Sequence, residues 1–475
     1  MPKLVSLFVV ILALHSSAFA QQGAAISSNP RTFPVGTIVP KVATIAKPEQ
    51  SYALYLPTSY SGAKRWPIVY VFDPGAHGDV PVELMKDPAE RYGYIVVGSN
   101  NSRNGSWAIE GEAAQAMVQD TQETFPLDPN RLYFAGFSGG ARVAARIAQV
   151  CKCAAGVFLH GAGFQPDTSA SAGPRFAVFA AVGTVDFNYG EVVRLDDQLE
   201  KLGYVHFLRR FEGPHQWAPE NVMEEAFAWF RLEAMKNGLE AHDDSFVAAE
   251  ASRESRRAAA LEQSNDLFAA WKEYRQASEM LAGLADNSAL RARAEALEKN
   301  KAIRDGAKRE KQEFDDQEEW TRVIYVGLSA LQEYQDNRPE IRRVVDQKIL
   351  DLRQSTEREK HPEKSRVLKR SLAGVFGLAM DTGIAQLDKK EVHRALDYFE
   401  LACDADPDSV WALTELAVAK AIDGDRKGTM EALRHASTRT KNPGRFTEWL
   451  NEEPAFAKLR GSPEFAALLE KPQQH

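Results

Sequence analysis

The chain has 475 residues, more than a single hydrophobic core usually supports, so we expect two or more domains. Hydrophobic residues make up 44% and charged residues 26% of the chain, a composition that excludes a mostly disordered or membrane-embedded protein. The formal net charge of -8 gives no positive excess to attract phosphate backbones, so we do not expect nucleic acid as a main partner.

The first twenty residues have the pattern of a secretory signal peptide. Lys3 precedes an apolar run over residues 4–14, and Ala18-Phe19-Ala20 supplies the small residues of a cleavage site. The run is too short for a stable membrane span. We predict that residues 1–20 are removed and that the mature protein is exported, periplasmic or extracellular, with no stable membrane span. A retained N-terminal anchor is the alternative.

Three cysteines are too few for a disulfide scaffold. Cys151 and Cys153 are spaced poorly for a zinc site and for a thioredoxin-type redox motif, so we interpret them as buried, unreactive thiols. We expect neither a metal nor a cofactor.

Residues 36–238 alternate short apolar runs with helical stretches, which predicts a mostly parallel sheet flanked by helices. The predicted strands are Tyr52–Leu56, Ile68–Phe72, Tyr94–Ser99, Leu132–Ala135, Ala155–His160, Phe176–Val182 and Val205–Phe211. The predicted helices are Ile109–Thr124, Ala141–Gln149, Gly190–Lys201 and Glu220–Met235.

After Gly238 the composition shifts to Ala, Glu, Lys, Arg and Gln, which predicts a charged helical region over residues 244–370. Residues 371–475 place small, bulky and helix-ending residues at the spacing of a helical-hairpin repeat: Gly383, Ala395, Phe399, Ala402 and Pro407. The pattern resembles tetratricopeptide repeats. That resemblance implies an all-α region of about two hairpins with a C-terminal cap, and a protein or peptide partner for it.

A nucleophile motif lies between a predicted strand and a predicted helix. Gly136-Phe137-Ser138-Gly139-Gly140 matches G-x-S-x-G and occupies the strand-turn-helix position that the motif requires. Bulkier neighbours would collide with the adjoining strand and helix. We therefore predict Ser138 as a catalytic nucleophile.

A serine hydroxyl needs a base and an orienting carboxylate, which follow in the chain order serine, acid, histidine. Asp186 lies in the loop after the strand Phe176–Val182, and His215 lies in the corresponding loop after the next strand, Val205–Phe211. Both strand ends belong to the edge of the sheet where functional groups gather. We predict Asp186 and His215 as catalytic partners.

Other residues fit these two roles less well. Asp196 and Asp197 lie inside a predicted helix, and His206 lies within a strand. His160 comes too early in the chain to be the base, although it follows the strand after the nucleophile.

An oxyanion intermediate needs two preorganised donors. The Gly139 N–H, directly after the nucleophile, is one candidate. The second should come from the loop after Ile68–Phe72, where Pro74 has no N–H, so Gly75 is preferred and Ala76 is the next choice. We name as candidate substrate-binding residues Ala76, Asn100, Trp107, His160 and Trp217.

Four stretches resemble the exported polyhydroxybutyrate-depolymerase and feruloyl-esterase branch of the α/β-hydrolases: residues 52–57, 66–72, 136–140 and 213–217. The resemblance covers residues 36–235. It implies hydrolysis of a small-molecule or polymeric ester through an acyl-enzyme, with Ser138 attacking, His215 moving the proton and Asp186 holding the imidazole. Dienelactone hydrolases and prolyl oligopeptidases share this layout, so lactones and peptides stay open as substrates.

A second hypothesis is an interaction protein that binds partners through its helical half, with the hydrolase domain as a scaffold. A third is a serine peptidase of the same fold. No propeller-like repeat precedes the catalytic region to screen peptide substrates, which disfavours the third hypothesis.

Overall fold

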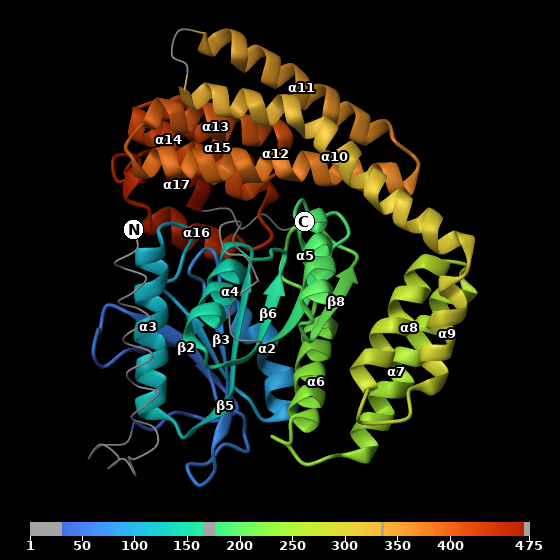
Figure 1. Ribbon diagram of the computed structural model, residues 1–475. Helices are drawn as coiled ribbons and strands as arrows, with labels where there is room; N and C mark the ends of the chain where they lie inside the picture. The colour runs from blue at the N-terminus through green and yellow to red at the C-terminus, as the bar shows by residue number, and fades with distance from the viewer. Residues whose placement is uncertain (1–30, 165–175, 334–336, 470–475) are drawn as a thin grey trace. The chain divides into compact units, whose positions relative to one another are not determined.

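The computed structural model describes residues 31–164, 176–333 and 337–469, and it contains an eight-stranded sheet (Figure 1). The strand order is β1-β2-β4-β3-β5-β6-β7-β8. Strand β2 runs antiparallel to both of its neighbours, and all other neighbours are parallel. The strands are β1 Ile38–Ala43, β2 Ser51–Tyr55, β3 Trp66–Phe72, β4 Ile95–Ser99, β5 Leu127–Phe137, β6 Ala154–His160, β7 Ala177–Gly183 and β8 His206–Phe211. The predicted signal peptide lies outside the described residues.

Both faces of the sheet are covered, because side chains alternate along each strand and the central strands are apolar nearly throughout. In β3, Val69 and Val71 enter a core shared with α2 Asp79–Tyr92 and α6 Glu220–Lys236. Ile68, Tyr70 and Phe72 enter the opposite core, which is closed by α3 Trp107–Thr124, α4 Gly139–Cys151 and α5 Tyr189–Leu202.

The predicted fold class is confirmed: a mostly parallel sheet of the α/β-hydrolase type flanked by helices, followed by an all-helical C-terminal region. Every predicted strand and helix is present. Strand β1 and helix α2 were not predicted. Helix α2 carries Pro88 in its interior, which ordinarily argues against a helix, and β1 is an edge strand with Pro40 in it.

The chain forms two compact units, and the first one extends further than the predicted catalytic domain of residues 36–238. It comprises the described residues up to Thr184 and then Asn188–Arg309. Helices α7 Asp244–Gln263, α8 Leu267–Leu281 and α9 Ser288–Glu298 therefore belong with the sheet. The predicted boundaries at 238/244 and 370/371 do not separate the compact units.

A buried ionic cluster explains why α7 and α8 fold with the sheet. Arg209 of β8 has a side chain only 5% exposed, and it pairs with Glu225 of α6 at 2.5 Å, Glu254 of α7 at 3.0 Å and Glu273 of α8 at 2.7 Å. A guanidinium with five donors can serve three carboxylates at once. Because a buried charge is tolerated only when it is paired, these contacts bind the helices to the strand.

The second unit comprises Val185–Phe187 and the helices from Glu310 onward. Its helices are α10 Lys301–Glu333, which begins in the first unit, α11 Arg338–Arg358, α12 Pro362–Asp388, α13 Val392–Ala405, α14 Val410–Asp423, α15 Arg426–Arg439, α16 Pro443–Glu452 and α17 Pro463–Leu469, with a 3-10 turn at Pro454–Phe456.

Helices α12 and α13 pack together in this unit, and so do α14 and α15. Gly383 allows the first pair to approach, because a Cβ there would lie 2.6 Å from Cε1 of Phe399. The hairpins are thus present, while the tetratricopeptide likeness and its peptide partner stay predictions.

The short segment Val185–Phe187 groups with the helices of the second unit. The carbonyl oxygen of Phe187 accepts a hydrogen bond from Gln317 Nε2 of α10 at 3.1 Å. A Cβ at Gly377 of α12 would lie 3.2 Å from the Phe187 ring, so only a glycine leaves comfortable room for that ring.

Cys151 and Cys153 are joined in a disulfide, which corrects their interpretation as free thiols. Lys152 ends α4 in the left-handed region with φ of 54°. This turn brings the two Cα atoms to 5.1 Å, within the range that a disulfide requires.

Among the described residues, no helix combines the length and the apolar character needed to cross a membrane.

We predict that Arg209→Met lowers the free energy of unfolding by about 3–5 kcal/mol, because three carboxylates lose their buried partner. The matched control is Arg91→Met, which removes an ion pair to Glu224 from an arginine that is 65% exposed. Its cost should stay below about 1 kcal/mol. Urea titration followed by tryptophan fluorescence measures both, and equal costs would contradict the role given to Arg209.

Candidate active site

Ser138 stands on a strained turn between β5 and α4. Its φ is 53°, in the left-handed region that non-glycine residues rarely adopt, and its ψ is -120°. A Cβ at Gly136 would lie 2.7 Å from the backbone nitrogen of Ala141, and one at Gly140 would lie 2.6 Å from the carbonyl carbon of Phe72 in β3. The turn is held this tightly because strand and helix meet without intervening side chains.

The structure brings Ser138 and His215 together, although they are far apart in the chain. His215 Nε2 lies 2.9 Å from Ser138 Oγ, the distance of a hydrogen bond. His215 follows β8, and its ring packs on Phe137 with centroids 4.6 Å apart. A base within hydrogen-bond reach of a hydroxyl can take its proton, which is the first requirement for a serine nucleophile.

Asp186 is fully buried and lies in the segment between β7 and α5. This is the place in the chain that the sequence assigned to the acid. Its pairing with His215 stays a prediction. The alternative candidates Asp196 and His206 contact each other instead. His206 Nε2 lies 3.3 Å from Asp196 Oδ1, and His206 Nδ1 lies 3.0 Å from the carbonyl oxygen of Tyr204.

The loop after β3 is organised by Asp73, which sequence reasoning missed. Its Oδ1 accepts the Gly75 N–H at 2.8 Å and the His77 N–H at 3.3 Å, and its backbone oxygen accepts the Ala76 N–H at 3.1 Å. Its Oδ2 accepts the Trp217 indole N–H at 2.9 Å. A polar residue at the end of a buried parallel strand was the signal that could have identified Asp73.

Asp73 is ionised at neutral pH. Burial alone would raise the pKa of its carboxyl, but hydrogen bonds from His77, Trp217 and Gly75 outweigh burial and lower that pKa. The Gly75 N–H is thus directed at a carboxylate in this structure, and its predicted role as second oxyanion donor stays untested. Ala76 has φ of 62°, so the turn carries backbone strain.

His160 is enclosed in the structure, and its predicted role in substrate binding stays a prediction. Its side chain is fully buried, with ring centroids 3.6 Å from Phe158 and 4.8 Å from Trp217. Burial lowers the pKa of His160 well below its ordinary value, and within the described residues neither ring nitrogen has a hydrogen-bond partner. Its backbone oxygen accepts the Ser138 N–H at 2.9 Å, so it supports the nucleophile from β6.

The loop from Ser99 to Trp107 is held by contacts to β1 and α4. Asn100 Nδ2 donates to the carbonyl oxygen of Pro40 at 3.1 Å, which fixes the loop to β1. Trp107 begins α3 with its ring 4.2 Å from the guanidinium carbon of Arg146. Substrate binding by Asn100, Trp107, Trp217 and Ala76 stays a prediction.

The side chain of Asn104, from the same loop, lies against the nucleophile turn. A Cβ added to Gly139 would collide with Asn104 Oδ1. Sequence reasoning had no signal for this contact, because nothing in a polar loop says which of its residues reaches a distant turn.

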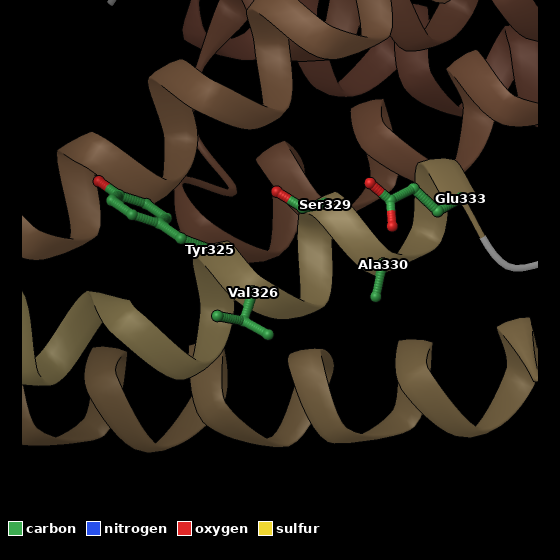
Figure 2. Close-up of a pocket in the computed structure, with 5 residues that line it drawn as sticks. All are labelled: Tyr325, Val326, Ser329, Ala330 and Glu333. Atoms are coloured by element: carbon green, nitrogen blue, oxygen red, sulfur yellow. The ribbon is translucent and has the colours of Figure 1, made fainter.

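A hollow of about 400 Å³ lies along α10, lined by Tyr325, Val326, Ser329, Ala330 and Glu333. Figure 2 shows Tyr325, Ser329 and Glu333 on one side of the helix and Val326 and Ala330 on the other. None of the predicted site residues lines it. Over the described residues, no group of three or more His, Cys, Asp or Glu side chains is placed to hold a metal.

No family model matches this chain, and no curated protein matches it. Among solved structures, FphF, a fluorophosphonate-binding serine hydrolase of Staphylococcus aureus, is 14% identical over 42% of this chain and 99% of its own, with a TM-score of 0.34. A hyperthermophilic esterase from the archaeon Pyrobaculum calidifontis is 12% identical over 49% of this chain and 93% of its own, with a TM-score of 0.35.

A dienelactone hydrolase-like promiscuous phosphotriesterase, P91, from metagenomic libraries is 13% identical over 42% of this chain and 97% of its own, with a TM-score of 0.33. At these identities the likeness concerns the fold alone.

Glu110 lies in the first turn of α3, close after the loop that carries Asn104. Its side chain is buried, and burial raises the pKa of its carboxyl to about 7, although Arg146 and the Gly105 N–H partly oppose the shift. The folded chain therefore binds this proton more tightly than the unfolded chain. The protonated carboxyl contributes to the free energy of unfolding below pH 4.5, and this contribution is lost as the pH rises towards 7.

We predict that Glu110→Gln removes this pH dependence. The free energy of unfolding of the variant, relative to wild type, should increase between pH 5 and pH 8, and urea titration at each pH measures it. The control Glu112→Gln changes a carboxylate on the same helix that is 48% exposed, and its difference from wild type should stay flat. Parallel curves for Glu110→Gln and wild type would contradict the prediction.

Proposed function

We propose that the protein is a serine hydrolase that cleaves carboxylic esters through an acyl-enzyme. The observation that carries this proposal is the 2.9 Å contact between His215 Nε2 and Ser138 Oγ at a strained turn after a parallel strand. Backbone strain at a glycine-flanked serine costs free energy that a purely structural turn does not need to spend. Nucleophilic catalysis, in contrast, requires a serine hydroxyl in contact with a base such as an imidazole.

In the acylation step, Ser138 Oγ attacks the ester carbonyl carbon while His215 Nε2 takes the hydroxyl proton. The carbonyl π electrons move to oxygen, and the resulting oxyanion is stabilised by the Gly139 N–H, directly after the nucleophile. As the carbonyl re-forms, the bond to the leaving alcohol breaks, and His215 returns the proton to the alcohol oxygen.

In the deacylation step, water attacks the acyl carbon as His215 takes one of its protons. The bond to Ser138 Oγ then breaks, the serine recovers the proton from His215, and the carboxylic acid leaves. We assign to Asp186 the role of holding the imidazole in the tautomer that accepts at Nε2 and of stabilising the imidazolium. Its burial after β7 supports this assignment, because a buried carboxylate needs a charged or donating partner.

Esters are favoured as the substrate class by the sequence resemblance to polyhydroxybutyrate depolymerases and feruloyl esterases over residues 52–57, 66–72, 136–140 and 213–217. Export is proposed from the signal-like residues 1–20. The disulfide between Cys151 and Cys153 supports export, since disulfides persist mainly in oxidising compartments.

We predict that a fluorophosphonate probe labels Ser138 and that Ser138→Ala abolishes labelling. Turnover of p-nitrophenyl butyrate should fall by roughly 10⁶-fold, because the nucleophile is lost. The control is Ser59→Ala, an exposed serine in the loop after β2, which should keep wild-type labelling and turnover. Intact-mass analysis and circular dichroism follow labelling and folding.

Well-folded wild-type protein that is neither labelled nor active on short acyl esters would exclude the proposed function. Full activity in Ser138→Ala would require another nucleophile.

A further inference from the structure

The proposed reaction needs two hydrogen-bond donors at the oxyanion. The backbone N–H groups of the loop after β3, however, donate to Asp73 within the same loop. The N–H groups of Gly75 and His77 donate to the Asp73 carboxylate, and that of Ala76 donates to the Asp73 carbonyl oxygen. Since hydrogen bonding lowers the pKa of Asp73, the loop holds a negative charge that the Gly75 and His77 amides stabilise. An oxyanion would compete with a carboxylate for the same donors.

Asn104 lies against Gly139, whose N–H is the first donor. Its backbone N–H donates to the carbonyl oxygen of Pro74 at 2.9 Å, and the adjacent Arg103 forms an antiparallel bridge with Gly75. These contacts lay its loop along the turn after β3. A Cβ at Gly139 would collide with Asn104 Oδ1 and lie 3.5 Å from its Nδ2, so the carboxamide occupies the space beside the nucleophile turn.

Within the described residues, the side chains of the neighbouring Asn100 and Asn101 form hydrogen bonds to the backbone, unlike the side chain of Asn104. Asn100 Nδ2 donates to Pro40 O, and Asn101 donates from Nδ2 to Glu49 O at 3.2 Å while its Oδ1 accepts the Ser51 N–H at 2.8 Å. In the described part of the chain, the side chain of Asn104 makes no hydrogen bond, and the residue is exposed. Its carboxamide is therefore available to a ligand at Gly139.

We propose that Asn104 Nδ2 is the second oxyanion donor and acts with the Gly139 N–H. This proposal rests on the proposed ester hydrolysis. A half-turn about the Cβ–Cγ bond exchanges Oδ1 and Nδ2, so the amide can present its N–H₂ where oxygen now lies. As the tetrahedral intermediate forms, the carbonyl electron pair moves to oxygen, and Asn104 donates a hydrogen bond without transferring its proton.

The arrangement also explains why residue 139 is a glycine. A side chain there would collide with the Asn104 carboxamide and displace it from Gly139. Asp73 then has a positioning role, because it orders the turn on which the Asn104 backbone rests.

The test compares Asn104→Ala and Asn104→Asp with wild type in the full-length mature protein. The kcat for p-nitrophenyl butyrate should fall by about 10²–10³-fold in the alanine variant, with KM changed less than threefold, because the lost hydrogen bond forms mainly in the transition state. Asn104→Asp should lose at least as much, since an isosteric carboxylate cannot donate and repels the oxyanion. The affinity for a trifluoromethyl ketone, which forms a tetrahedral adduct, should fall in parallel with kcat/KM.

The control is Asn130→Ala, an exposed asparagine near the start of β5, which should match wild type in every measurement. Thermal unfolding verifies that each variant folds. Asn104→Ala with kcat within threefold of wild type would overturn the proposal while leaving ester hydrolysis intact. A wild-type protein with no fluorophosphonate labelling would overturn the proposed function, and this inference with it.

Discussion

The left-handed backbone of Ser138 is the constraint on which the candidate site depends. It lets β5 turn directly into α4, so that the hydroxyl meets His215 Nε2 at 2.9 Å and the first amides of α4 follow the nucleophile. The strain is held by close packing: Gly136 lies against the backbone of α4, and Gly140 lies against Phe72 of β3. Strain of this kind persists only where the surrounding structure enforces it.

The loops on both sides of the nucleophile are linked through Asp73. Its carboxylate accepts the Trp217 indole N–H from the loop after β8, and the Trp217 ring packs 5.5 Å from the ring of Phe137 in the nucleophile motif. Phe137 in turn packs on His215. The ionised carboxylate therefore connects the turn after β3 to the loop that carries His215. This connection holds both loops in position next to Ser138.

The two compact units do not follow the change in composition after Gly238. Arg209 forms ion pairs with glutamates of α6, α7 and α8 in one buried cluster. Helices α7 and α8, which lie after Gly238, therefore fold with the sheet. Charged residues on an amphipathic helix are normally interpreted as solvated surface. Here several of them face the core because an arginine on the last strand requires buried partners.

The sequence by itself determined the alternation of strands and helices, the nucleophile turn at Ser138 and the place of His215 after the last strand, because each depends on a short local pattern. It also indicated the small residue Gly383 that admits Phe399. The role of Asp186 as the acid stays a prediction. Tertiary structure alone decided that Cys151 and Cys153 are bonded, that His160 is enclosed, that the Gly75 N–H serves Asp73 and that Asn104 reaches Gly139. These last features depend on burial and on backbone turns and loop contacts that only the folded chain fixes, and no local propensity encodes them.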